Sequence, residues 1–347
     1  MVTNKISIIM PAFNSEKYIK KSITSLLFQT YKDIELIIIN DGSTDNTENI
    51  ILDFQKIDKR IKYFKTHNSG AANARNLGLS NATGQFISFV DSDDYIDSRM
   101  MEVLINKYNE FHSDIIGCGA ERIYPDRAIP NKSSFEKGFY SKADLESKFY
   151  PNLFCTNELE DKIPKSMWSK LFRRDIIEEN NIRFTPGLKF AEDLIFTETC
   201  FLYANSFYYL PEEKFYKYVY NENSITHSYV KDLWINSKKG VLHRKKISDK
   251  FPNYELSSQL SYVLVRNAMT AIANLGYSEN SSASQRINRI KEIITDVDLQ
   301  NAVNQVDIKK LNFVRKALAS SIKNKNTYLI FVLLKGYSFF QNNNIFI

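Results

Sequence analysis

Short apolar runs in the first hundred residues alternate with segments that carry apolar residues on one helical face. The runs have almost no polar alternation and end at breakers or acidic turns, which predicts buried strands at 6–10, 34–39, 61–64 and 86–90. A helix face is indicated by Ile19, Ile23, Leu26 and Leu27. A second, Ala-rich helix is expected at 70–80. Such alternation predicts an α/β fold, with a parallel sheet covered by helices on both faces.

The pattern changes after about residue 120. Residues 120–225 are irregular and rich in Asn, Lys and Pro, with a helical piece and two strand-like pieces at 191–203, 206–210 and 215–220. From 228 onward the pattern is helical, with polar breaks near 278–284 and 323–326. We therefore predict a first domain over 1–227, divided near residue 119, and a mainly helical region over 228–347.

Composition supports a globular protein in a reducing compartment. The 347 residues suit about two domains of roughly 150 residues each. An apolar fraction of 43% and a charged fraction of 25% exclude a disordered chain. The three cysteines are isolated in sequence, and the first residues contain no signal-peptide hydrophobic region. We expect a cytoplasmic protein.

The charge is uneven along the chain. From Lys231 to the end we count 18 basic and 8 acidic residues, so that segment is strongly basic although the whole chain carries only +6. This segment contains a basic cluster of five residues, Lys238, Lys239, Arg244, Lys245 and Lys246. This favours an anionic partner, either a membrane surface or a polyanionic polymer, against the alternative of solvated helix faces.

An apolar stretch near the end, 328–334, is too short for the ~20 residues that span a bilayer. It could lie on the inner face of an anionic membrane beside the basic helices. The competing interpretation is packing into the protein's own core or a subunit interface, so a homo-oligomer is also open.

Polar residues follow three of the predicted strands, where an open α/β sheet presents its crevice. They are Pro11-Ala12-Phe13-Asn14 after the first strand, Asp41 after the second, and Asp91 with Asp93 after the fourth. We predict a shared site, against the alternative of ordinary turn and cap residues. Two close carboxylates favour a hard divalent cation, Mg²⁺ or Mn²⁺, which also takes phosphate oxygens.

The chain has no GxGxxG after the first strand and no GxxxxGK[ST], which disfavours a Rossmann dehydrogenase and a P-loop nucleotidase. A nucleotide would instead be held by Asp41 at the base and by Arg75 at a diphosphate, unless Arg75 is a surface residue. Glu192-Asp193 could supply a general base or form an ordinary acidic pair at a helix N-terminus.

Six segments together resemble the family 2 inverting glycosyltransferases with the GT-A fold, of the bacterial surface-polysaccharide type. They are Ser7–Asn14, Glu35–Asp45, Asn68–Gly78, Phe89–Asp94, Trp168–Arg174 and Ala191–Phe196. The similarity covers about 4–225 in the family's order, and the last third carries no recognised motif.

The resemblance implies transfer of a sugar from a nucleotide-diphosphate donor, usually a UDP-sugar, to an acceptor hydroxyl with inversion. The acceptor would be a surface polysaccharide, a teichoic-acid-type polyol-phosphate polymer or a lipid-linked oligosaccharide. It makes 1–119 the nucleotide-binding half and 120–227 the acceptor and base half. The stretch 120–165 would be a lid or acceptor wall.

Site residues follow from the same resemblance. It implies that the donor is bound by Pro11, Ala12, Phe13, Asn14, Glu16, Asp41, Asn68, Arg75, Asp91 and Ser92. Asp41 would contact the base, Asp91 the ribose and Asp93 the metal, with Asp91 beside it. Asp193 would be the general base with Glu192 next to it. Trp168 and Lys170 would face the acceptor.

Many relatives carry a histidine after the late Tyr-rich strand as a further metal ligand. Here the aligned position holds Asn221, and the nearest imidazole is His227, so either is a candidate third ligand.

Two other functions remain as alternatives. A nucleotidyltransferase would need a Gly-rich basic loop after the first strand, which is absent. A non-catalytic polyanion-binding scaffold is disfavoured by the intact Asp91, Asp93 and Asp193. No motif supports a nucleic-acid partner.

Overall fold

The computed structural model describes residues 4–188, 190–221, 229–278 and 281–342, with side chains up to Leu334. The chain divides into two compact units. The first comprises Met1–Ser147 and Ile163–Asn221, and the second Lys148–Lys162 and Glu222–Ile347. Residues 148–162, which the sequence placed in the first domain, therefore pack with the helical unit.

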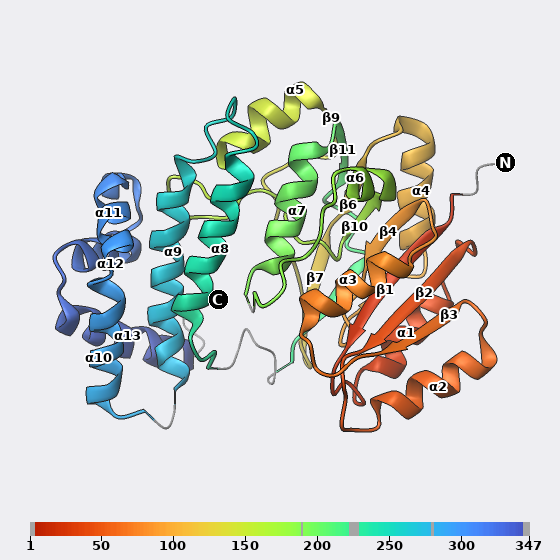
Figure 1. Cartoon of the computed structure of the whole chain (residues 1–347), viewed down its shortest axis with the longest axis horizontal. Helices are drawn as coiled ribbons and strands as arrows, with labels where there is room; N and C mark the ends of the chain where they lie inside the picture. The colour runs from red at the N-terminus through yellow and green to blue at the C-terminus, as the bar shows by residue number, and fades with distance from the viewer. Residues whose placement is uncertain (1–3, 189, 222–228, 279–280, 343–347) are drawn as a thin grey trace. The chain divides into compact units, whose positions relative to one another are not determined.

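An eight-stranded sheet forms the centre of the first unit (Figure 1). Its strands, in spatial order, are β3 (Ile61–Lys65), β2 (Ile34–Asn40), β1 (Ile6–Ala12), β4 (Phe86–Phe89), β10 (Lys170–Arg173), β6 (Ile115–Cys118), β11 (Ser206–Leu210) and β9 (Gly138–Ser141). The four strands predicted in the first hundred residues form within two residues of their expected ends. They pair in parallel, as predicted.

The other half of this sheet is mixed. β11 pairs with β6 in parallel, whereas β10 is antiparallel to both β4 and β6, and β9 is antiparallel to β11. β6 and β10 were not predicted from the sequence. Each has only four residues, too few to show a period of two.

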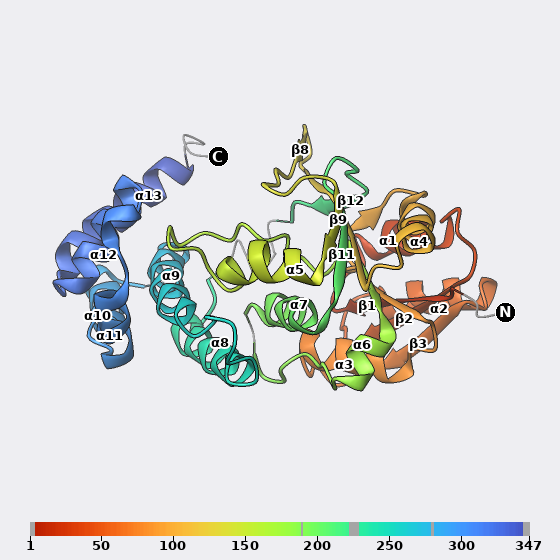
Figure 2. The ribbon, with the colours of Figure 1, turned by 90° about the horizontal axis from the view of Figure 1, so that it is seen from above.

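Helices cover both faces of the sheet. They are α1 (Ile19–Leu27), α2 (Thr47–Ile57), α3 (Ala71–Asn81), α4 (Met100–Phe111), α5 (Lys142–Asp144), α6 (Arg174–Glu179) and α7 (Glu192–Tyr203). Figure 2 shows α1 and α4 on one face and α3 and α6 on the other. Gly78 lets α3 approach the sheet closely, because a Cβ there would lie 2.4 Å from the Ile9 side chain. The predicted α/β architecture is confirmed.

Three strands of a second, four-stranded sheet lie in the region that the sequence indicated as irregular. Its order is β5 (Tyr95–Ile96), β12 (Tyr216–Val219), β7 (Ala120–Ile123) and β8 (Ala128–Pro130). With β9 and α5, much of the predicted lid or acceptor wall at 120–165 is thus regular structure. The strand-like piece predicted at 215–220 is confirmed as β12, whereas the other strands of this sheet have two to four residues and leave no periodic signal.

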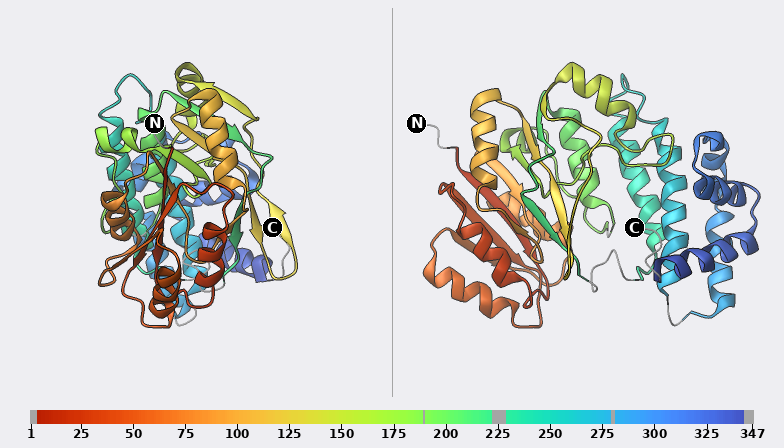
Figure 3. Two further views of the ribbon diagram at one scale, coloured as in Figure 1. Left: turned by 90° about the vertical axis from the view of Figure 1, so that its right-hand side faces the viewer. Right: turned by 180° about the vertical axis from the view of Figure 1, so that it is seen from behind.

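The second unit is helical, as predicted (Figure 3). Its elements are η2 (Tyr150–Asn152), α8 (Leu233–Ser248), α9 (Gln259–Asn274), η4 (Leu275–Tyr277), α10 (Ala283–Ile294), α11 (Val297–Gln305), η5 (Ile308–Lys310), α12 (Phe313–Lys323) and α13 (Thr327–Asn342), and η1 (Leu145–Phe149) leads into it from the first unit. The polar breaks fall between α10 and the preceding η4, and between α12 and α13. In the described part of the chain, no helix is long and apolar enough to cross a membrane.

The basic cluster of the helical unit is only partly exposed. Arg244 is buried and lies over the Phe154 ring, so it adds no charge to the surface. Lys238 is paired with Asp296 at 2.7 Å and Asp298 at 2.9 Å. Lys239, Lys245 and Lys246 are exposed. The apolar end is also split, with Ile330 and Leu334 buried but Tyr328, Leu329 and Val332 exposed.

Candidate active site

The ends of β1, β2 and β4 meet at one edge of the sheet, because the three strands are parallel. The backbone N–H of Asp41 donates to the Ala12 carbonyl at 2.8 Å. The hydroxyls of Ser15 and Ser92 lie 2.7 Å apart. The structure therefore brings together the loops that the sequence placed at a common site.

The first loop is held by its own polar groups. Asn14 is left-handed, with φ of 46°, and its Oδ1 accepts from the Thr44 N–H at 2.8 Å. Glu16 accepts from the Asn46 N–H at 2.8 Å. These bonds fix the loops after β1 and β2 against each other. Phe13 is left 46% exposed beside them, free to contact a ligand.

Asp41 organises the loop that leads into α3. Its carboxylate accepts from the Thr66 hydroxyl at 2.5 Å and from the N–H groups of Ser69 and Gly70 at 2.7 Å each. Burial acts to raise the pKa of Asp41, but these hydrogen bonds outweigh it and lower the pKa. Asp41 is thus held as an anion, and it positions the exposed Asn68 loop.

Arg75 joins the two acidic motifs of the site. Its Nη2 donates to Asp91 Oδ1 at 2.9 Å and its Nη1 to Glu192 Oε1 at 2.9 Å, while its side chain is only 8% exposed. Burial acts to lower the pKa of Arg75, but the negative charges of Asp91, Glu192 and Asp193 outweigh it and raise the pKa. The guanidinium therefore stays charged. Its buried Nε has no hydrogen-bond partner among the described residues. Arg75 is therefore buried between the two acidic motifs and is not a surface arginine.

Asp193 follows Glu192 in the first turn of α7 and is partly buried. Desolvation raises its pKa to about 6, the neighbouring Glu192 adds to the rise, and Arg75 opposes it. A carboxylate with a pKa near neutrality is a stronger base than an ordinary aspartate and is still ionised at pH 7. The position suits a general base.

The acidic loop after β4 contains two different kinds of aspartate. Asp94 is buried and accepts from the Tyr216 hydroxyl at 2.6 Å and the Val219 N–H at 2.8 Å, so it anchors β12. Asp93 receives a long side-chain hydrogen bond, 3.4 Å, from Asn221. Burial and the charge of Asp91 raise the pKa of Asp93.

Within the described ranges, the side chains near Asp91 and Asp93 could provide only some of the ligands that a hard divalent cation needs. Asp91 and Asp93 could offer carboxylate oxygens, whereas Asn221 turns its amide nitrogen toward Asp93, and no group of three His, Cys, Asp or Glu side chains is assembled within the described ranges. His227 lies outside them. The remaining ligands would be waters and donor phosphate oxygens, as Mg²⁺ and Mn²⁺ prefer.

The two residues predicted to face the acceptor behave differently. Trp168 is partly buried and stacks on Tyr216 with ring centroids 4.3 Å apart. Lys170 is completely buried, donates to the Ser166 carbonyl, and has a pKa lowered to about 7 by desolvation. In this conformation the Lys170 side chain offers no surface to an acceptor, so an acceptor role for it has no support here.

Tyr216 was missed by the sequence analysis. Besides bonding Asp94, its hydroxyl accepts from the Asp91 N–H at 3.3 Å, so one phenol holds the acidic loop from the second sheet. The only available signal was the Tyr-rich composition of 215–220, which did not distinguish this tyrosine from its neighbours.

Comparison with known proteins places the chain among glycosyltransferases. Residues 7–179 match the family described as Glycosyl transferase family 2. The poly(ribitol-phosphate) beta-N-acetylglucosaminyltransferase TarP of Staphylococcus aureus is 30% identical over 90% of this chain and 95% of its own length. The chain belongs to glycosyl transferase family 2.

Other relatives are longer than this chain. The glycosyltransferase GlyA of Streptococcus pneumoniae is 31% identical over 68% of this chain, but the match spans only 33% of GlyA.

The crystal structure of S. aureus TarS in complex with UDP-GlcNAc aligns with a TM-score of 0.66 at 23% identity, covering 96% of this chain and 91% of that one. This likeness confirms the predicted GT-A fold.

Proposed function

We propose that this enzyme transfers N-acetylglucosamine from UDP-GlcNAc to a hydroxyl of a polyol-phosphate polymer, with inversion at the anomeric carbon. The observation that carries the reaction type is the Arg75 bridge, which joins the donor-edge carboxylate Asp91 to the Glu192-Asp193 motif. The choice of sugar and acceptor is supported by similarity to TarP over nearly its whole length.

The donor would lie along the strand-end edge. The exposed Phe13 would contact the base, Asp41 fixes the neighbouring loop, and Asp91 and Asp93 would lie beside the diphosphate. Asp91 and Asp93 would hold the divalent cation. When bound, such an ion neutralises the negative charge that the departing diphosphate acquires.

Asp193 would accept the proton of the acceptor hydroxyl. The oxygen then forms its bond to the anomeric carbon as the bond from that carbon to the diphosphate oxygen breaks. UDP leaves with the bonding electron pair, and attack on the face opposite the leaving group inverts the configuration. Glu192 holds Arg75, and Arg75 in turn stabilises the negative charge around the base.

The test is a UDP-release assay with UDP-GlcNAc and poly(ribitol phosphate), run with Mn²⁺ and with chelator. We expect acceptor-dependent release that requires the metal.

Asp193→Asn should lower turnover by about 10²–10⁴-fold, the usual contribution of a general base, with donor affinity nearly unchanged. Asp93→Ala should instead abolish metal-dependent donor binding. Wild-type turnover in Asp193→Asn would remove the base assignment.

Donor choice is tested in the same assay with UDP-glucose and UDP-galactose. Faster release with either than with UDP-GlcNAc would contradict the proposed sugar while leaving the reaction type intact.

A further inference from the structure

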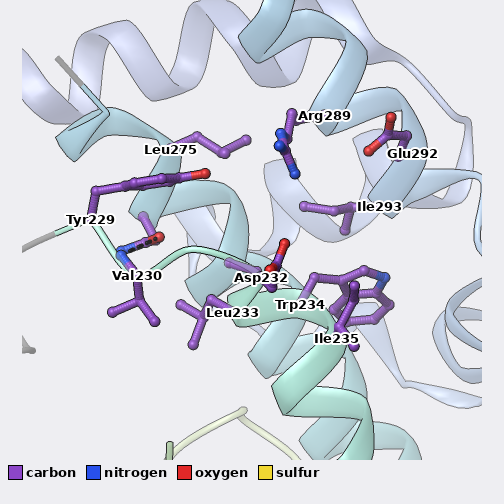
Figure 4. Close-up of a pocket in the computed structure, with 12 residues that line it drawn as sticks. Tyr229, Val230, Asp232, Leu233, Trp234, Ile235, Leu275, Arg289, Glu292 and Ile293 are labelled. Atoms are coloured by element: carbon purple, nitrogen blue, oxygen red, sulfur yellow. Dashed lines mark hydrogen bonds between the residues drawn. The ribbon is translucent and has the colours of Figure 1, made fainter. Parts of the chain in front are cut away.

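The helical unit contains a pocket between the segment that leads into α8 and the helices α8, α9 and α10 (Figure 4). Two aromatic residues, Tyr229 and Trp234, line it together with the polar residues Asp232, Asn274, Arg289 and Glu292. All of them belong to the second unit, whereas the candidate catalytic residues belong to the first. Nothing in the proposed reaction uses this pocket.

The entry segment is fixed in place by a buried side chain. Asn274 is 8% exposed, and its Oδ1 accepts from the Val230 N–H at 3.2 Å. That bond holds the backbone next to Tyr229, whose ring forms one side of the pocket in Figure 4. The backbone that carries this ring is therefore already ordered, which lowers the cost of binding a ligand beside it.

Asp232 adopts an unusual backbone conformation at the start of α8. Its φ is +61°, in the left-handed region that few residues other than glycine occupy. Although it stands at the N-cap position, its side chain caps no helix N–H. The carboxylate instead points toward the side of the pocket that Arg289 lines (Figure 4).

The charged side chains that line the pocket form no salt bridges with other described residues. Asp232, Arg289 and Glu292 are exposed, and none of the three forms an ion pair with another residue in the described ranges. With two carboxylates and one guanidinium, the pocket has an excess of negative charge. A phosphate group would be repelled on balance, whereas hydroxyl groups can donate to the carboxylates and accept from Arg289.

We propose that this pocket binds a neutral hexopyranose unit of a glycan, as a second saccharide site separate from the donor site. A pyranose ring has an apolar C–H face that packs on an aromatic ring such as Trp234, and ring hydroxyls that match planar, two-atom groups such as Asp232 and Arg289. An apolar pocket with a few convergent polar groups is the usual form of a small-ligand site. The proposal does not depend on the identity of the transferred sugar.

The chain has only two tryptophans, Trp168 and Trp234, one in each unit, which allows a direct test. The full-length protein would be labelled with 5-fluorotryptophan, and the two ¹⁹F resonances assigned with Trp234→Phe. We expect the Trp234 resonance to shift saturably with cellobiose or N,N′-diacetylchitobiose while the Trp168 resonance stays in place. Dissociation constants on the order of 1 mM are expected for a single exposed site.

Variants separate the pocket from a general surface effect. Arg289→Ala and Glu292→Gln should each weaken binding, by about tenfold for the loss of one good polar contact. Phe313→Ala is the control. It removes an aromatic side chain that is 87% exposed on α12 and does not line the pocket, so it should leave binding unchanged.

The proposal would be overturned by the absence of a saturable Trp234 shift with either disaccharide, by equal binding of glycerol phosphate, or by unchanged affinity in Arg289→Ala. A shift confined to Trp168 would also overturn it, because the sugar would then be bound in the first unit. None of these outcomes depends on transferase activity, so failure here is distinguishable from failure of the proposed function.

Discussion

At the scale of single residues, the candidate site depends on how a few charges are paired. Arg75 bridges Asp91 and Glu192 but balances only one of their two charges, and the partly buried Asp193 is left with a raised pKa. The same three types of residue on an exposed surface would have ordinary pKa values and little mutual influence.

The raised pKa of Asp193 predicts a particular pH profile. The base acts only as the carboxylate, so kcat/KM should rise with pH up to about 6, the pKa of Asp193, and level off above it. Asp193→Asn should have low activity without this limb. The measurement is the initial rate of UDP release from pH 4.5 to 8, with a check that the protein stays folded. A wild-type profile that is flat through pH 6 would exclude Asp193 as the group that titrates.

Arg75→Lys is a second prediction at this scale. An ammonium group cannot donate to Asp91 and Glu192 with the planar geometry of a guanidinium. Loss of one charge-assisted hydrogen bond, about 1.5–3 kcal/mol, predicts a fall in kcat/KM of roughly ten- to a hundredfold. Arg60→Lys is the matched control, since Arg60 pairs with Asp58 just before β3 and outside the site. Equal effects of both variants would count against the bridge.

At the scale of elements, the buried Glu35 ties the sheet together. On β2, it accepts from the Ser7 hydroxyl of β1 and the Thr83 N–H before β4, and pairs with Lys5 and with Lys62 of β3. Burial acts to raise the pKa of Glu35, but these four partners outweigh it and hold the pKa far below its usual value.

Glu35→Gln should therefore lower the free energy of unfolding at pH 7 by about 1–3 kcal/mol, the cost of leaving buried partners poorly satisfied. Because the folded pKa is depressed, the wild-type advantage is present above the unfolded pKa of about 4.3 and is lost as the pH falls below it. Urea unfolding at pH 7 and pH 3.5 measures both effects. Glu48→Gln, which removes a more exposed pair with Lys65, serves as the control. A stability difference that grows on acidification would contradict this account.

The sequence predicted those elements whose signal is local. Strands such as β1 and β2 are uninterrupted apolar runs, and the polar residues after them lie at one edge as parallel pairing requires. β10 was missed because its antiparallel insertion between β4 and β6 depends on tertiary pairing. The bonds of Tyr216 to the acidic loop were missed for the same reason, because they join residues more than 120 positions apart. Burial of Lys170 likewise follows from the position of β10, which its own composition does not reveal.

At the scale of the whole molecule, residues 148–162 are separated in sequence from the helices that they pack with. Gln259 of α9 accepts from the Phe154 N–H at 2.8 Å and donates to the Tyr150 carbonyl at 2.7 Å. One side chain thus satisfies two buried backbone groups of a segment about a hundred positions earlier.

Gln259→Leu should expose this dependence. It leaves a buried N–H and a buried C=O without their partner, at a cost of about 1–3 kcal/mol. Amide hydrogen exchange at Phe154 should accelerate, and the melting temperature should fall. Gln305→Leu, which removes a single exposed bond to Ser261, is the control. Unchanged exchange at Phe154 in Gln259→Leu would contradict the assignment.

The interleaved order of the two units has a consequence for modularity. The backbone passes from one unit to the other at residues 147–148, 162–163 and 221–222, so a single cut cannot separate them. A chain ended at residue 221 would keep Leu153 and Phe154, both fully buried here, without the helices that cover them. Such a fragment would expose an apolar segment and be prone to aggregate. Recombination that replaced only the C-terminal helices would need new helices that pack against this segment. Because residues 148–162 belong to the helical unit but lie within the sequence of the first, we expect the two units to be exchanged in evolution only as a pair.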